Sequence, residues 1–301
     1  MSEEIGIANT QLIGTSGVER SRLERQIENL VVEMESTETQ LNTLEASNPT
    51  PNRHYLQLKE DLPKIDFVKQ MNRVESILKR FNPDGGAALF LIQDSYSMAG
   101  AYLKARIQDC LGTKAKHYPV VFSLDTGVDE RALLDRLAGY FDVQAISELN
   151  QYALAIVNKL CQSLRGGTTI FVELQKWDEV PDQDRVLSWF LEHFWIPLGQ
   201  QLNAVSQTYR GFKVIAVIVS DTELSAECLE LPCYCKSREF DSQKVVPLPL
   251  KNWEEGEIQH WLEIHQELSR SRSETLAKRI YQKSKNGIPQ LVIGALIQEF
   301  T

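Results

Sequence analysis

Near the start of the chain, hydrophobic and polar positions form a single helical pattern. Residues 1–20 are rich in Ser, Gly, Thr and Asn and show no period, which predicts a flexible tail. After them, apolar residues recur in alternating steps of four and three, with Thr37 in the one gap: Leu23, Ile27, Leu30, Met34, Leu41 and Leu44. Such spacing, kept over about three heptads, is typical of a coiled-coil seam.

A second helical stretch follows this seam. Residues 47–52 contain two prolines and form a turn segment that a helix cannot cross. Beyond it, three apolar residues mark the next helix: Tyr55, Leu58 and Leu62. Because so short a loop favours antiparallel packing, the pattern predicts a helical hairpin or coiled coil over residues 21–62. The alternative is a surface helix that packs its apolar stripe on its own domain.

The period changes after a third helical stretch, which begins beyond Pro63 and ends at the breaker segment 82–86. Continuous apolar runs, of the kind found in buried parallel strands, cover residues 87–92, 120–124, 168–174 and 214–219, with 245–246 as a candidate fifth strand. Helical patterns lie between them, at 101–110, 131–141, 147–164 and 186–205. This alternation predicts an α/β fold over residues 63–247, with a mainly parallel five-stranded sheet and helices on both faces. Residues 248–301 predict helices only, the first of them capped by Asn252 and Glu255.

The loop after the first predicted strand is the place where an open α/β sheet binds ligands. A phosphate-binding loop of the pattern G-x-x-x-x-G-K-[ST] needs glycines so that its amides can surround the phosphates, followed by a Lys and a Ser or Thr. The loop length fits, but four other residues stand at those positions: Asp94, Ala99, Gly100 and Ala101. The carboxylate would repel a polyphosphate, and Lys104, one helical turn further on, is predicted to face elsewhere. We therefore do not expect nucleotide hydrolysis at this loop.

The third predicted strand carries a second departure from the pattern of phosphate-loop enzymes. Such enzymes end this strand in an Asp that holds Mg²⁺, whereas this chain has Glu173 followed by Leu174. Glu173 could bind a cation, but a carboxylate at a strand end is more often solvated or bonded to a nearby turn, and we favour that alternative. We expect neither a metal nor a cofactor.

Four segments, taken in order, point to one protein family. Residues 65–70 form a hydrophobic–acid–aromatic lead-in that ends in Gln, and residues 88–92 with 102–103 frame a phosphate-loop position that lacks its Lys. Residues 247–262 are similar to a strand-to-helix passage that leaves a nucleotide-binding core, and residues 286–289 contain a Gly-x-Pro lid motif. Together they resemble the STAND class of P-loop signalling ATPases, and within it the inactive STAND group of bacterial proteins.

This resemblance covers roughly residues 63–301. It implies a degenerate P-loop, AAA-like core, a lid-like helical subdomain over 248–301, no ATP turnover and a role in signalling or defence systems. It also implies an emptied nucleotide pocket, whose residues would be Asp94, Ala99, Gly100, Ala101, Glu173 and Pro289.

Composition limits the class of protein and its partners. Hydrophobic residues make up 43% and charged residues 24% of the chain, which excludes wholesale disorder. A net charge of −9 lacks the positive field that non-specific nucleic-acid binding needs. No apolar run reaches the roughly 18–20 residues of a membrane helix, and no signal peptide is visible. We expect a cytoplasmic protein that binds neither a membrane nor nucleic acid.

Three remaining clusters are interpreted as structural. The spacing of Cys228, Cys233 and Cys235 is poor for a zinc site, so we expect ordinary reduced thiols. The aromatic patch at 189–195 predicts core or interdomain packing, with a partner surface as the alternative. The basic stretch 270–285 predicts a solvated helix face.

Two functional hypotheses follow. The first is a non-catalytic signalling or scaffold protein that recruits a protein partner, or a second copy of itself, through the seam residues of its N-terminal helices. The second is a nucleotide-binding switch without hydrolysis, in which amides at the start of the helix near Tyr102 still hold a nucleotide. An active ATPase is disfavoured because it would need a lysine supplied by another chain.

Overall fold

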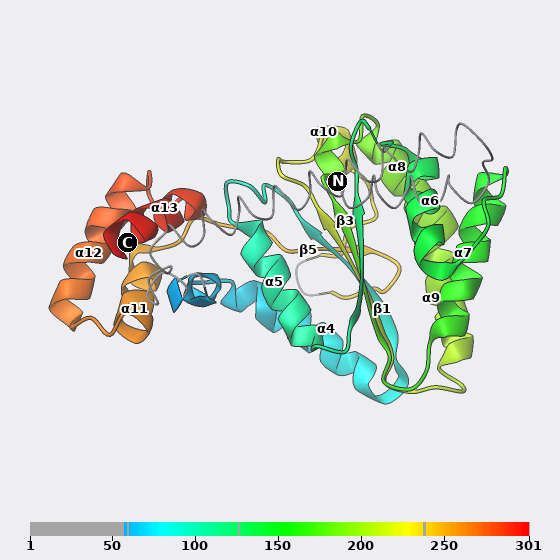
Figure 1. Cartoon of the computed structure of the whole chain (residues 1–301), viewed down its shortest axis with the longest axis horizontal. Helices are drawn as coiled ribbons and strands as arrows, with labels where there is room; N and C mark the ends of the chain where they lie inside the picture. Colours follow the sequence, from blue (N-terminus) through cyan, green and yellow to red (C-terminus); the bar gives the residue numbers. More distant parts are fainter. Residues whose placement is uncertain (1–56, 59, 126, 237–238, 301) are drawn as a thin grey trace, which may run out of the picture. The chain divides into compact units, whose positions relative to one another are not determined.

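The computed structural model describes residues 57–58, 60–125, 127–236 and 239–300 (Figure 1). The predicted tail and the whole of the seam from Leu23 to Leu44 lie outside the described residues. The hairpin over 21–62 and its partner-binding role therefore stay predictions.

Five parallel strands form one sheet, in the order β2-β3-β4-β1-β5. Their bounds are β1 Gly86–Ile92, β2 Lys116–Val121, β3 Thr169–Gln175, β4 Lys213–Val219 and β5 Val245–Pro247. The apolar runs of β1, β3 and β4 are almost completely buried, as expected of a parallel sheet that is covered on both faces. The α/β fold with a five-stranded parallel sheet that the sequence predicts is thus confirmed.

Helices cover both faces of this sheet (Figure 1). Those of the α/β part are α4 Val68–Asp84, α5 Gly100–Leu111, α6 Glu130–Phe141, α7 Leu149–Ser163, α8 Gln183–Phe190, α9 Ile196–Val205 and α10 Ala226–Leu229. Short 3-10 turns stand at η1 Leu62–Lys64 and η2 Trp177–Glu179. The largest hydrophobic core lies between the sheet and helices α6–α9, whereas α4 and α5 lie on the opposite face. Because side chains alternate along a strand, every second residue of β1, β3 and β4 faces α4 and α5.

The second strand begins and ends earlier than its apolar run predicts. It spans Lys116–Val121 rather than 120–124, in register with β3 from Ile170 to Gln175. Leu124, which the prediction placed in the strand, is 82% exposed. The reason is that β2 is an edge strand and only partly buried, so polar residues are tolerated along most of its length.

The predicted helix over 186–205 is continuous, but its middle widens into a π-helical turn at Leu191–Trp195. Phe190 and Phe194 stack with ring centroids 5.3 Å apart, and the Trp195 Nε1–H donates to the Ser242 carbonyl at 2.8 Å. All three rings are buried, which confirms the expectation that this aromatic patch belongs to the core.

Three helices follow β5, at α11 Glu255–His265, α12 Arg270–Lys283 and α13 Pro289–Phe300. The helical C-terminal region is therefore confirmed, but its first cap is not. Glu254 and Glu257 form the capping box of α11, in place of the predicted Asn252 and Glu255. Lys251 favours this register because its ammonium contacts both carboxylates, at 3.1 and 2.9 Å.

Among the described residues, no helix combines the length and apolar character that crossing a bilayer requires.

Candidate functional site

The loop between β1 and α5 lies at the carboxyl end of the parallel strands, where open α/β sheets bind ligands. Asp94 lies near its start, Ala99 is the N-cap of α5, and Gly100 and Ala101 are the first residues of that helix. The structure therefore brings four of the predicted site residues into one short segment.

The backbone amides at the start of this loop are already engaged by protein carbonyls. The N–H groups of Asp94, Ser95 and Tyr96 donate to three successive carbonyls of residues 220–222, at 3.0, 3.0 and 3.3 Å. A phosphate-binding loop instead turns successive amides toward its ligand. These three donors hold the loop against the segment that follows β4.

The second half of the loop folds back on the first. The Met98 amide donates to the Asp94 carbonyl at 3.1 Å, and the Gly100 amide donates to the Ser95 carbonyl at 2.8 Å. A Cβ atom on Gly100 would lie 2.6 Å from the Ser95 Oγ and 2.8 Å from the Ile92 Cγ2. A methyl group would thus already force neighbouring atoms to move, so this turn of the loop packs closely against Ser95 and Ile92.

The Asp94 side chain is also engaged within the loop. Its carboxylate accepts a hydrogen bond from the Ser97 hydroxyl at 2.8 Å. The Ser97 carbonyl in turn accepts from the amide of Gln290 at 3.0 Å. Gln290 follows Pro289, the buried first residue of α13, so this bond brings the last predicted site residue close to the loop.

Glu173 lies apart from this hydrogen-bonded loop, inside the layer between the sheet and α5. Its side chain is 1% exposed, and the Lys104 ammonium lies 2.5 Å from its Oε1. The His117 Nε2 lies 2.7 Å from its Oε2, and the Gln175 amide donates to Oε1 at 2.6 Å. The expectation of a solvated or turn-bonded Glu173 is therefore wrong.

The position of Lys104 follows from the helical period. It comes four residues after Gly100, on the same face of α5, and Gly100 packs against Ile92 of the sheet. Lys104 therefore reaches into the sheet-facing layer, where it meets Glu173. A buried carboxylate is tolerated only when it is paired and hydrogen-bonded, and here the chain itself provides the cation.

A statistical model of one protein family matches this sequence. The model, described as inactive STAND (iSTAND), matches residues 62–219, slightly more than half of the chain. The chain belongs to the inactive STAND family. No curated protein matches the sequence.

Solved structures that are similar to this chain include Cdc6p from Pyrobaculum aerophilum, at 12% sequence identity and a TM-score of 0.46. That match covers 76% of this chain and 60% of the other. The Aeropyrum pernix ORC1 protein in complex with DNA matches at 14% identity and a TM-score of 0.40, over 76% of this chain and 58% of the other. This inactive STAND chain thus spans about 60% of the length of the chains it matches.

The lead-in residues 65–70 of this inactive STAND chain contact both α5 and the segment that precedes α11. The Arg106 guanidinium donates to the Asp66 carbonyl, and the Phe67 ring meets Trp253 edge-on, with centroids 6.2 Å apart. Burial, and then the charge of Glu257, raises the pKa of the Asp66 carboxyl. The acid and the aromatic residue of the lead-in therefore make structural contacts, in addition to resembling the family pattern.

The cysteine cluster shows the properties of buried thiols. Burial raises the pKa of Cys233 to about 11 and also raises that of Cys228, so both are neutral thiols at physiological pH. Within the described part of the chain, no group of three or more His, Cys, Asp or Glu side chains is arranged to hold a metal ion.

Sequence reasoning did not assign the partners of Glu173. Lys104 could have been found from its four-residue spacing after Gly100, which places it on the sheet side of the helix. His117 carried no signal, because the strand that contains it begins before the apolar run that marks it. Gln175 lies two residues after Glu173 and so on the same face of β3, a signal the alternation of a strand does provide.

Proposed function

We propose that this protein is a non-catalytic signalling or scaffold component, in which the nucleotide site of a STAND-like domain has been converted into internal structure. Membership of the inactive STAND family supports this proposal. In this interpretation, Asp94, Ala99, Gly100 and Ala101 replace the residues that would bind phosphate. The setting we propose is a cytoplasmic signalling or defence system.

The single observation that carries the proposal is the pair formed by Lys104 and Glu173. In phosphate-loop enzymes, a carboxylate at this strand position faces Mg²⁺ bound to the nucleotide. Here an ammonium group lies 2.5 Å from the carboxylate, which is 1% exposed. A magnesium ion would have to displace this lysine and reopen the layer between β3 and α5.

The same proposal predicts that the protein does not bind nucleotide. Because five amides of residues 94–100 and the Glu173 carboxylate already have partners within the chain, isothermal titration with ATP and Mg²⁺ should give no saturable heat. ADP should give the same result, and so should ATP without Mg²⁺. A second measurement checks this result: the thermal unfolding midpoint of the protein should not move at nucleotide concentrations that saturate ordinary ATPases.

Saturable nucleotide binding would favour the second candidate, a switch that binds without hydrolysing. That candidate would need free amides at the start of α5, whereas the Tyr102 amide donates to the Ala99 carbonyl at 3.0 Å. Release of inorganic phosphate from ATP by the purified chain would contradict both candidates.

We further propose that partners bind through the N-terminal seam, which lies outside the described residues. Replacing Ile27 and Leu30 together by Lys should lower the solution mass of an oligomer, or abolish capture of a partner, because charges at seam positions break knobs-into-holes packing. Light scattering after size exclusion measures the mass directly. The matched control replaces Gln26 and Asn29 by Lys, which adds the same charge off the seam. If the two double variants have the same solution mass and capture a partner equally, the proposal that partners bind through the seam is contradicted.

A further inference from the structure

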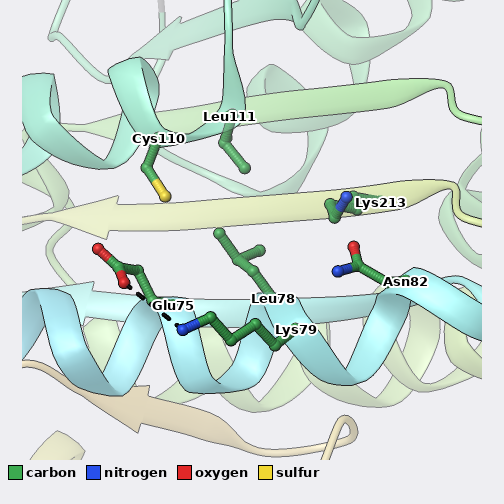
Figure 2. A pocket seen from close by; sticks show the side chains of 7 residues that line it. All are labelled: Glu75, Leu78, Lys79, Asn82, Cys110, Leu111 and Lys213. Atoms are coloured by element: carbon green, nitrogen blue, oxygen red, sulfur yellow. Dashed lines mark ion pairs between the residues drawn. The ribbon is translucent and has the colours of Figure 1, made fainter.

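Two cavities are lined in part by α4, and they differ in charge. The larger, of about 460 Å³, is lined by Lys69, Gln70 and Arg73 of α4 and by residues 248–251, which connect β5 to α11. The smaller, of about 260 Å³, lies between α4, the end of α5 and the start of β4 (Figure 2). Its lining is Glu75, Leu78, Lys79, Asn82, Cys110, Leu111 and Lys213.

Among the described residues that line it, the larger cavity has cations and no carboxylate. Its charged side chains are Lys69, Arg73 and Lys251, in a chain whose net charge is −9. In the smaller cavity, by contrast, the Glu75 carboxylate lies 3.9 Å from the Lys79 ammonium (Figure 2). An anion entering the smaller cavity would meet that carboxylate. In the larger cavity the Lys251 ammonium is already paired with Glu254 and Glu257, at 3.1 and 2.9 Å, so the positive charge left for an anion is that of Lys69 and Arg73.

Hydrogen bonds hold the polar wall of the larger cavity in place. The Arg73 guanidinium donates to the Pro247 carbonyl at 2.9 Å and to the Lys236 carbonyl at 3.1 Å. The Gln70 amide donates to the Pro249 carbonyl at 2.5 Å. A cavity that is already formed by such bonds needs little reorganisation to accept a ligand.

Two donors of this wall remain available to a ligand. A guanidinium carries five N–H donors, more than the two carbonyls that Arg73 contacts can take up. Lys69 forms no hydrogen bond or ion pair with any described residue and is exposed. The two residues are four apart on α4 and therefore lie on the same face of the helix.

The opposite wall is apolar. Leu248, Pro249 and Leu250 form it, and the Leu248 amide donates to the Leu91 carbonyl of β1 at 2.9 Å, which fixes this wall to the sheet. A volume of about 460 Å³ is in the range of small-molecule sites. Charge on one side and hydrocarbon on the other favour a ligand with an anionic head and an apolar body.

We propose that this cavity binds a small amphipathic anion, with its apolar body against Leu248–Leu250 and its anionic group at Lys69 and Arg73. The site is separate from the loop after β1 and does not depend on nucleotide. Because its wall is the segment between β5 and α11, a bound ligand ties that segment to α4 and should raise the thermal midpoint of the chain.

The test uses three probes with the same ten-carbon tail: decanoate, decanol and decyltrimethylammonium, each titrated into the full chain below its aggregation concentration. We expect decanoate to bind saturably and at least about tenfold more tightly than decanol, and the cationic probe to bind more weakly still. No saturable binding of decanoate would overturn the proposal. Equal affinities for the three probes would also overturn it, because they would indicate adsorption to apolar surface alone.

Charge-reversal variants locate the binding site. Lys69→Glu should weaken decanoate binding about tenfold or more, and Lys69→Arg should keep it. Lys79→Glu is the matched control, because it makes the same change on the same helix at the smaller cavity. Leu250→Trp should abolish binding by filling the larger cavity. Equal weakening by Lys69→Glu and Lys79→Glu would assign the binding to general surface charge and overturn the proposal.

Discussion

Replacing Lys104 by Met should lower the free energy of unfolding by about 3–5 kcal/mol, because it leaves the Glu173 carboxylate buried without a full counter-charge. Met keeps the length and much of the hydrocarbon volume of the lysine, so the change tests the ammonium group and not the packing. The His117 ring and the Gln175 amide would still contact the carboxylate. Urea denaturation, followed by the midpoint and the slope of the transition, measures the loss.

A double-mutant cycle separates the pair from its surroundings. Adding Glu173→Gln to Lys104→Met removes the uncompensated charge and should recover a large part of the lost stability. The control is Lys79→Met, which breaks an ion pair of 3.9 Å whose lysine is 76% exposed, and which should cost about 0.5 kcal/mol or less. If Lys104→Met also costs only about 0.5 kcal/mol, water reaches Glu173. The proposal that Lys104 occupies the place of a bound cation would then fail.

The sequence predicted the central strands of the sheet closely and the edge strand less well. The strands β1, β3 and β4 are central and covered on both sides, so their uninterrupted apolar runs located them to within about a residue. The edge strand β2 lacks that signal because it is half-exposed, and its prediction was displaced by several residues. The cap of α11 was misplaced for another reason. Two overlapping capping patterns were available, Asn252 with Glu255 and Glu254 with Glu257, and Lys251 favours the later one.

At the site, the sequence indicated candidate residues but not the contacts that the structure gives them. The sequence predicts that Asp94, Ala99, Gly100 and Ala101 occupy the phosphate-loop positions, and the structure places them between β1 and the first turn of α5. The engaged amides of the loop depend on residues 220–222, which lie far along the chain and carry no motif. The burial of Glu173 depends in the same way on pairing between β2, β3 and α5, which local pattern does not encode. Long-range contacts therefore decided whether the site is open, and only the structure could provide them.

Replacing Gly287 by Ala should destabilise the chain by about 3 kcal/mol and detach α13 from the loop after β1. A Cβ atom at this position would lie 1.9 Å from the Trp253 carbonyl oxygen, so the backbone would have to move. The φ angle of +84° adds strain for any residue with a side chain. The move would break the bond from the Trp253 amide to the Gly287 carbonyl, now 2.8 Å, and would pull the Gln290 amide away from Ser97. Hydrogen exchange at Gln290, measured together with urea denaturation, reports both effects.

Gly294 in the same helix provides the matched control. Apart from its chain neighbours and the backbone of its own helix, no atom lies within 4 Å of a Cβ built there, so Gly294→Ala should stabilise α13 by about 0.5–1 kcal/mol through helix propensity alone. Opposite signs for the two Gly→Ala changes would show that the positive φ and the close approach to Trp253, and not glycine content, make Gly287 necessary. If Gly287→Ala leaves the Gln290 amide protected, the lid-like motif does not hold α13 on the loop. The closed loop would then have to depend on its own bonds to residues 220–222.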